Sequence, residues 1–333
     1  MRANVDALFE GDTAADVVIG LTRARLVSNA IMAAVQLNLA DYLADGPRTV
    51  DILAEETGAD RVSLLRLLRC LAIVGVFKEV EPLCFSQTEI SEVLRSGVPD
   101  SVRDFVLMDA SDWSRDGVGR LTECIRTGYP CMDDFYGYMT QHPDDAAILN
   151  SALAAATGRE LRVLDRIDFS SAETIADVGG GNGTFLREIL SQYPDKRGVL
   201  ADLPAVAEEA RQVLGSANLL DRCQVVDVNM LESLPFRADT IILKRVLMDW
   251  SNEDVRRILR NCRASLSDAG RILIMETLSS SLMGALNDLL VLAFTNGSAR
   301  SEDDFSRLLE DSGMRMTDVV SLPSGFSVIE ARV

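Results

Sequence analysis

The second half of the chain alternates short apolar runs with helical stretches, and this alternation limits the fold more than any other feature. Six runs are typical of buried strands: ETIADV, RGVLAD, CQVVDV, TIILKRV, RILIMET and SVIEARV. Amphipathic stretches such as NEDVRRILRNCRASL separate them. Strands that alternate with helices form parallel, doubly wound sheets, because the crossover helices cover the two faces. We therefore predict an α/β fold that binds its ligands at the carboxyl ends of the strands.

The first part of the chain lacks this alternation and has a helical pattern. Apolar positions recur every three or four residues in residues 21–46, and Gly46-Pro47 ends this helix. The stretch from Val50 to Ile90 then predicts two helices and a short β-ribbon, which is the pattern of a winged helix. We predict three parts, namely an N-terminal domain, a mostly helical linker and the α/β domain: residues 1–105, 106–168 and 169–333.

The charge of the chain limits its partners. Lys and Arg total 33 against 51 Asp and Glu, so the net charge is −18. Such a field repels nucleic acid and anionic lipid, and it suits a neutral or cationic small ligand. We therefore expect a small-molecule substrate and no nucleic-acid partner, although a winged helix alone would also suggest DNA binding.

Several features favour a cytoplasmic protein. The start MRANVDALFEGD lacks the basic and apolar regions of a signal peptide, and no run approaches about 18 uninterrupted apolar residues, so we expect no membrane span. The one histidine, His142, leaves no ligand-spaced cluster, so we expect no metal. Six cysteines without a C-x-x-C spacing are expected to be reduced core residues: Cys70, Cys84, Cys124, Cys131, Cys223 and Cys262.

A glycine-rich turn is the strongest functional signal. The strand ending at Asp177 runs into Gly179, Gly181 and Gly183, and a helix follows at Thr184. Glycines allow a tight turn and let a ligand approach the backbone closely. The G-x-G-x-G spacing differs from a dinucleotide fingerprint, and no Gly-Lys-Ser/Thr of a P-loop follows. The turn therefore favours a nucleoside ligand without phosphate.

The next two strands end in polar residues suited to such a ligand. Asp202 follows Gly183 by 19 residues, where an acid can accept hydrogen bonds from ribose hydroxyls. Asn229 and Met230 follow the third strand and can address the edge and face of an adenine. Asp202 and Asn229 can alternatively be turn residues at strand ends.

By these motifs and their order, the chain resembles S-adenosylmethionine-dependent small-molecule O-methyltransferases of the plant caffeate and bacterial polyketide-tailoring types. The resemblance covers nearly the whole chain, in RLLRCLAIVGVF, DVGGGNG, LADLP, LKRVLMDWSNED, ILRNCRASL and GSARSEDDF. It implies a Rossmann-like class I sheet, a winged-helix dimerisation domain and a homodimer. It also implies a site for S-adenosylmethionine and its product S-adenosylhomocysteine, at Asp177, Gly179, Gly181, Gly183, Asp202, Leu203, Asn229, Met230 and Lys244.

The sequence departs from this family where the catalytic base is expected. Plant members have a histidine where Met248 stands, and methionine cannot accept a proton. Of the two glutamates that assist this histidine, one matches Glu276 and the other matches Ala299. Asp249 and Glu276 remain as possible proton acceptors, although Asp249 can instead anchor the turn beside Trp250. We take Met248, Asp249 and Glu276 as the catalytic positions.

Three functions are compatible with this pattern. A methyltransferase can work without the histidine, because proximity and alignment supply about 7–11 kcal/mol and an acidic phenol ionises readily. O-methylation with substrate-assisted deprotonation is therefore our first reading. A non-methylating enzyme can instead use the charge of the bound cofactor to stabilise an anion, as in ring formation or rearrangement. A non-catalytic dimer is the third reading, and the preserved glycine turn and Lys244 speak against it.

Aromatic and methionine side chains suggest the substrate pocket. A flat apolar slot is suited to a ring-bearing natural product. Each candidate can alternatively be an ordinary core residue. By analogy with the family, the candidates are Trp113, Phe135, Tyr136, Met139, Met248, Leu289 and Phe294.

Overall fold

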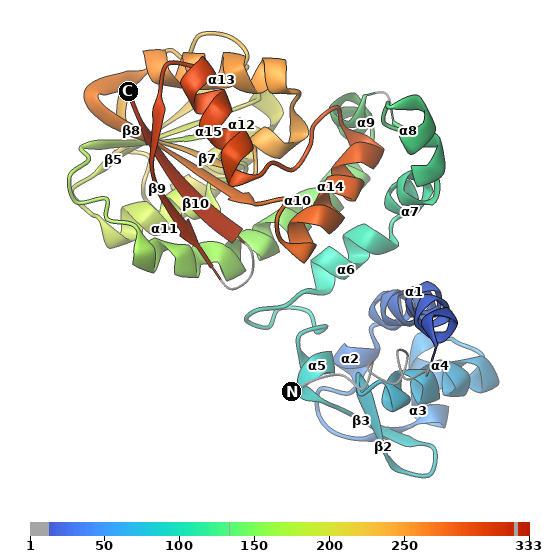
Figure 1. Ribbon diagram of the computed structural model, residues 1–333. Helices are drawn as coiled ribbons and strands as arrows, with labels where there is room; N and C mark the ends of the chain where they lie inside the picture. Colours follow the sequence, from blue (N-terminus) through green and yellow to red (C-terminus); the bar gives the residue numbers. More distant parts are fainter. Residues whose placement is uncertain (1–12, 133, 323–325) are drawn as a thin grey trace. The chain divides into compact units, whose positions relative to one another are not determined.

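Seven strands form one sheet in the larger of two units of the chain (Figure 1). Their order is β6-β5-β4-β7-β8-β10-β9, in which β10 runs antiparallel to β8 and β9 and the others are parallel. This confirms the predicted doubly wound sheet. The bounds are β4 (Thr174–Val178), β5 (Arg197–Asp202), β6 (Cys223–Asp227), β7 (Ala238–Lys244), β8 (Leu266–Thr277), β9 (Arg315–Ser321) and β10 (Phe326–Arg332).

The computed structural model describes residues 13–132, 134–322 and 326–333. Its contacts divide the chain into two units, of which one comprises Met1–Arg115 and Asp144–Ala156. The other comprises Asp116–Pro143 and Thr157–Val333. The predicted domain boundaries at residues 105 and 168 do not coincide with this division, and they stay a prediction.

Helices cover both faces of the large sheet and form two apolar cores (Figure 1). Helices α13 and α15 pack on one face through residues such as Ile258 and Phe305. Helices α11 and α12 and the short helix η2 pack on the other, through residues such as Phe185 and Leu214. The bounds are η2 (Leu161–Arg166), α11 (Thr184–Gln192), α12 (Pro204–Ser216), α13 (Asn252–Ala264) and α15 (Glu302–Asp311).

Further helices lie before and between these elements. Ser281 caps α14 by accepting a hydrogen bond from Gly284 N–H at 2.9 Å. Helices α7 and α10 each contribute residues to both units. The bounds are α7 (Asp112–Gly119), α8 (Leu121–Thr127), α9 (Phe135–Gln141), α10 (Pro143–Glu160), η3 (Leu247–Asp249) and α14 (Leu282–Phe294).

The N-terminal unit has the helices and the β-ribbon expected of a winged helix. Strands β2 and β3 form an antiparallel pair, and β1 adds to β3. Leu53, Leu68 and Phe85 are fully buried in its core. The bounds are α1 (Ala14–Gln36), α2 (Leu39–Tyr42), β1 (Arg48–Thr49), α3 (Val50–Thr57), α4 (Arg61–Ile73), β2 (Phe77–Glu81), β3 (Cys84–Gln87), α5 (Glu89–Glu92) and α6 (Arg103–Ala110).

Helix α1 leaves much of its apolar surface uncovered. It packs on α4 and α6, yet Val18 and Leu21 are 61% and 60% exposed. By length and composition alone, α1 is long and apolar enough to cross a membrane, which differs from our expectation that no segment qualifies. Only 11% of its most apolar window is buried within the unit, so this surface is suited to contact with a further molecule.

Candidate active site

The glycine-rich loop joins the end of β4 to the start of α11, as predicted. Gly179, Gly181 and Gly183 have φ angles of 71°, 58° and 80°, a conformation that favours glycine. A Cβ atom at Gly179 would lie 2.6 Å from Cγ2 of Val246, so packing also excludes a side chain there. A Cβ atom at Gly181 would meet nothing within 4 Å. The backbone at Gly181 is therefore open to a ligand.

Asp202 ends β5 and lies beside this loop. Its Oδ2 accepts a hydrogen bond from the backbone N–H of Gly181 at 2.8 Å, and its Oδ1 accepts one from Leu203 N–H at 2.7 Å. Burial raises the pKa of Asp202, while these two hydrogen bonds oppose that shift. Each oxygen keeps a free lone pair, so the carboxylate can accept bonds from paired hydroxyls such as those of ribose. Leu203, 46% exposed, adds an apolar surface next to it.

Asn229 and Met230 follow β6, but they have different surroundings. The terminal methyl of Met230 would lie 3.3 Å from a Cβ atom at Gly179, so Met230 lies against the glycine loop. Asn229 is exposed, and its Oδ1 accepts a hydrogen bond from Leu231 N–H at 3.1 Å. Its position thus suits both alternatives, a turn residue and an adenine contact.

Lys244 ends β7 and reaches the last turn of α10. Its Nζ donates to Oγ1 of Thr157 at 2.9 Å and to Oε2 of Glu160 at 3.3 Å, and it lies 5.6 Å from the ring centroid of Phe185. Glu160 also pairs with the guanidinium of Arg245. Burial lowers the pKa of Lys244, and the charge of Glu160 opposes this shift. A positive cluster thus lies at this edge of the sheet, held by one buried glutamate.

Asp177 is only 1% exposed, and within the described residues no donor reaches either of its carboxyl oxygens. Burial raises its pKa to about 7, and the charge of Lys244 works against this shift. A buried carboxyl group without a donor is rare, and it needs its own proton or a donor brought by a ligand. The role of Asp177 in binding a ligand stays a prediction.

Met248 and Asp249 lie in η3, directly after β7, and Glu276 holds this short turn from the end of β8. Oε1 of Glu276 accepts hydrogen bonds from the N–H groups of Leu247 at 3.0 Å and Met248 at 3.3 Å. Burial, and then the neighbouring charge of Asp249, raise the pKa of Glu276 to about 7. Glu276 thus contacts the backbone of Met248, the position where we predicted that the family's histidine is missing.

Arg300 holds the same turn from the other side. Its guanidinium donates to the carbonyl oxygens of Leu247 at 2.6 Å and Trp250 at 2.7 Å, and Arg300 is only 3% exposed. The backbone that carries Met248 and Asp249 is therefore fixed by two buried polar side chains, those of Glu276 and Arg300.

Aromatic side chains lie next to this turn. The hydroxyl of Tyr136 donates to Oδ2 of Asp249 at 2.7 Å. The ring centroid of Phe135 lies 5.4 Å from that of Tyr136 and 5.6 Å from that of Phe294. Three residues of the predicted pocket, Phe135, Tyr136 and Phe294, therefore lie in one aromatic cluster beside Asp249.

The other predicted pocket residues lie on α9, on α14 and in the other unit. Met139 is buried on α9, the helix that carries Phe135, whereas Leu289 is 44% exposed on α14. Trp113 belongs to the other unit. Their roles as substrate contacts stay predictions.

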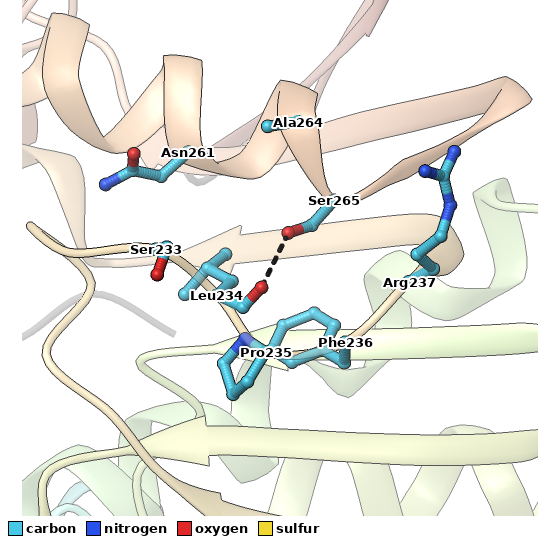
Figure 2. A pocket seen from close by; sticks show the side chains of 8 residues that line it. All are labelled: Ser233, Leu234, Pro235, Phe236, Arg237, Asn261, Ala264 and Ser265. Carbon is cyan, nitrogen blue, oxygen red and sulfur yellow. Dashed lines mark hydrogen bonds between the residues drawn. The ribbon is translucent and has the colours of Figure 1, made fainter.

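A surface pocket of about 440 Å³ lies elsewhere on the large unit (Figure 2). It is formed by the chain before β7 and the end of α13, where Ser265 Oγ donates to Leu234 O at 3.3 Å. The carboxylates described above are absent from its lining. We therefore place the candidate active site at the carboxyl edge of the sheet and not in this pocket.

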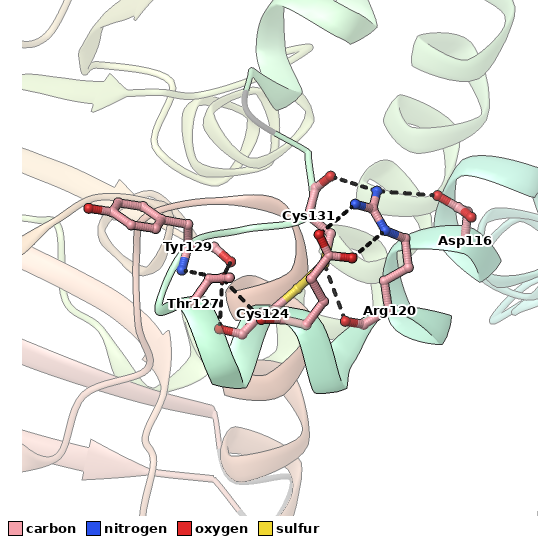
Figure 3. Close-up of a disulfide and its surroundings, with 7 residues drawn as sticks. Asp116, Arg120, Cys124, Thr127, Tyr129 and Cys131 are labelled. Atoms are coloured by element: carbon pink, nitrogen blue, oxygen red, sulfur yellow. Dashed lines mark hydrogen bonds and ion pairs between the residues drawn. A yellow bond between two sulfur atoms is a disulfide. The ribbon is translucent and has the colours of Figure 1, made fainter.

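A disulfide corrects one prediction about the cysteines. Cys124 and Cys131 are bonded across the turn after α8, where Gly128 adopts a φ of 75° (Figure 3). The backbone N–H of Cys131 donates to Ala293 O at 3.0 Å, and its carbonyl accepts from Arg120 at 3.0 Å. The prediction that all six cysteines are reduced is therefore wrong for this pair. No C-x-x-C spacing marks this pair, so nothing in the sequence distinguished these two cysteines from the other four.

Two residues important to this geometry, Arg300 and Glu160, were not among the predicted site residues. Arg300 and Glu160 act through backbone and charge contacts that no local motif predicts. Tyr136 was considered only as a pocket wall, because its spacing from Asp249 of 113 residues hides their contact.

Two parts of the chain match known protein families. Residues 117–315 match a family described as the O-methyltransferase domain, and residues 20–97 match the O-methyltransferase dimerisation domain. The first match covers most of the large unit, and the second lies within the N-terminal unit.

Relatives match over almost the full length of the chain. The phenazine O-methyltransferase of Lysobacter antibioticus is 34% identical, over 92% of both chains. The mitomycin biosynthesis 6-O-methyltransferase of Streptomyces lavendulae is 36% identical, over 94% of this chain and 91% of the relative. A methyltransferase of calicheamicin biosynthesis, solved with S-adenosylhomocysteine bound, has a TM-score of 0.84 and 30% identity, over 96% of this chain and 97% of its own.

Proposed function

The chain belongs to the O-methyltransferase family that uses S-adenosylmethionine, and we propose that it methylates a hydroxyl group on a small aromatic natural product. The observation that carries this proposal is the contact between Tyr136 and Asp249, with Phe135 and Phe294 beside it. It provides a proton acceptor next to flat apolar surfaces, which suit a hydroxylated ring.

The residues at the carboxyl edge of the sheet fit the cofactor. We assign its ribose hydroxyls to Asp202 and its adenine to the surfaces of Leu203, Asn229 and Met230. The open backbone at Gly181 and the donor-free carboxyl of Asp177 support a polar ligand at this loop. Lys244 would hold the carboxylate end of the cofactor. When bound, S-adenosylmethionine supplies an electrophilic methyl group, and the protein positions the acceptor and removes its proton.

We propose that two copies assemble through the exposed face of α1. The dimerisation-domain match to residues 20–97 and the exposure of Val18 and Leu21 support this assembly. A second copy would then cover the apolar face of α1, which would not have to contact a membrane. We also propose a cytoplasmic location and no nucleic-acid partner.

The test uses S-adenosylmethionine carrying a 13C-labelled methyl group. Purified protein is incubated with a panel of hydroxylated aromatic acids, phenazines and quinones, and with matched panel members in which an amine or a hydrogen replaces the hydroxyl. We expect a 13C-methyl ether from at least one hydroxylated compound and no label in its matched partner without hydroxyl.

Two outcomes would contradict the proposal. Label on an amine alone would indicate N-methylation. Binding of S-adenosylhomocysteine without any label transfer would indicate the non-methylating alternative. The relatives that are O-methyltransferases speak against this alternative.

A further inference from the structure

Asp249 and Tyr136 come from distant parts of the chain and meet in one short hydrogen bond. Tyr136 lies in the first turn of α9, and Asp249 ends η3 after β7. The donor–acceptor distance of 2.7 Å is typical of a hydroxyl donating to a carboxylate. The Tyr136 residue as a whole is 45% exposed, so its ring borders an opening while its hydroxyl reaches the carboxylate.

The carboxyl groups of Glu276 and Asp249 differ in which oxygen atoms remain able to bind a ligand. Oε1 of Glu276 is occupied by the N–H groups of Leu247 and Met248, and Oε2 is fully buried without a partner among the described residues. In the described part of the chain, Oδ2 of Asp249 accepts the Tyr136 hydrogen bond and Oδ1 accepts none. Unlike Oε2 of Glu276, Oδ1 is not a fully buried atom, so a ligand can reach it. Glu276 is therefore committed to the turn, whereas Asp249 keeps an oxygen for a ligand.

We propose that Asp249 accepts the proton of the substrate hydroxyl through Oδ1, and that Tyr136 is the positioning residue that holds Oδ2. This inference rests on the proposed O-methylation and names what replaces the missing histidine. The O–H bond of the substrate breaks, its proton passes to Oδ1 of Asp249, and the freed electron pair of the oxygen forms the bond to the methyl carbon. With S-adenosylmethionine bound, the S–CH3 bond would break in the same step, and sulfur would keep its electron pair and leave as the thioether of S-adenosylhomocysteine. Asp249 loses the proton to solvent after the product leaves.

The charges around Asp249 support this role. Three groups on separate elements face it: Tyr136 from α9, Arg245 after β7 and Glu276 from β8. Burial raises the pKa of Asp249 to about 6, and the Tyr136 hydrogen bond and then the charge of Arg245 lower it. Asp249 is thus mostly ionised near neutral pH, yet basic enough to take a proton from an acidic phenol.

The first test measures the pKa of the Asp249 carboxyl group and needs neither substrate nor methyl transfer. Infrared difference spectra of the full chain are recorded across pH, and the Asp249 carboxyl band is assigned by its loss in Asp249→Asn. In Tyr136→Phe we expect the pKa of this band to rise, because the variant removes a donor that stabilises the carboxylate. The same pKa in wild type and Tyr136→Phe would overturn the positioning role. Tyr129→Phe, an exposed tyrosine, is the matched control.

The second test uses the acceptor identified by label transfer. In Asp249→Asn we expect kcat to fall by about 10²–10⁴-fold, with unchanged affinity for S-adenosylhomocysteine as evidence of an intact fold. In Tyr136→Phe the acid limb of the kcat/KM profile should move to higher pH, in step with the infrared pKa. Full activity of Asp249→Asn would overturn the proposal. Absence of any acceptor would contradict the proposed function, while the infrared titration would still report on the pair.

Discussion

At the scale of single residues, the site depends on carboxylates buried among apolar neighbours. Sequence reasoning proposed Asp177 and Asp202 from the ends of predicted strands, and Asp249 and Glu276 from the resemblance to the family. It could not identify the contacts around Asp249, because Tyr136 reaches its carboxylate, and Arg300 the turn that carries it, from distant parts of the chain. The motif therefore predicts which residues lie at the edge of the sheet, whereas packing decides which of them is free to act.

Glu276 should make the stability of the fold depend on pH. Its pKa in the folded chain is about 7, above the ordinary value of 4.5, so the folded state keeps a proton that the unfolded state has lost. Its contribution therefore becomes less favourable as pH rises from 4.5 to about 7, and it then levels off. Glu276→Gln removes this dependence and keeps an oxygen for the N–H groups of Leu247 and Met248.

The stability of Glu276→Gln relative to wild type should therefore rise by about 2 kcal/mol between about pH 5.5 and about pH 8. Urea unfolding at several pH values measures this difference. Glu310→Gln, on the exposed surface of α15, should give a curve parallel to wild type. A constant difference for Glu276→Gln would show that the carboxyl is ionised throughout.

Asp202 should determine cofactor affinity. Its carboxylate accepts bonds from Gly181 N–H and Leu203 N–H, and an asparagine offers only one acceptor oxygen for both and none of the charge. We expect Asp202→Asn to weaken S-adenosylhomocysteine binding by about 10–100-fold, or about 1.4–2.8 kcal/mol, in titration calorimetry. Asp221→Asn, an exposed site with the same charge change, should bind as wild type. Equal affinity of all three proteins would remove Asp202 from the cofactor site.

At the scale of elements, the strands with continuous apolar runs were predicted and one edge strand was not. Strand β9 was missed because RMTDVVS has few apolar residues and pairs only with β10. A sheet buried on both faces has a strong sequence signal, whereas an edge strand has little to bury.

The disulfide between Cys124 and Cys131 should stabilise the segment between α8 and α9. Closing so short a loop is worth about 2–3 kcal/mol in the chain-entropy description. We expect Cys131→Ser to lower the melting temperature, and a reductant to lower that of wild type but not of this variant. Cys70→Ser, at an exposed free cysteine, should keep the melting temperature of wild type and its decrease with reductant.

A direct count of thiols tests the bond itself. Unfolded, non-reduced wild type should react at four thiols, namely Cys70, Cys84, Cys223 and Cys262. Six reactive thiols would return the pair to the reduced state that the sequence first suggested.

At the scale of the whole molecule, the exposed apolar face of α1 and the match to a dimerisation domain both indicate that a second copy binds the chain. A single unit leaves Val18, Ile19, Leu21 and Leu26 of α1 between 52% and 61% exposed. Apolar surface of this extent is uncommon on a monomer, and burial contributes about 25 cal/mol per Å². Residues 20–97 match a dimerisation domain, so a partner copy is the molecule best suited to cover α1.

Charges placed on this surface should separate the copies. In Val18→Asp/Leu21→Asp, each carboxylate would have to be buried without a partner, which costs several kcal/mol per group. We expect sedimentation to give 36.3 kDa for this variant and twice that mass for wild type. Leu220→Asp, at a 49% exposed leucine outside residues 20–97, should remain dimeric. If the α1 variant instead kept the wild-type mass, the dimer would have to form through another surface, and α1 would need a different partner.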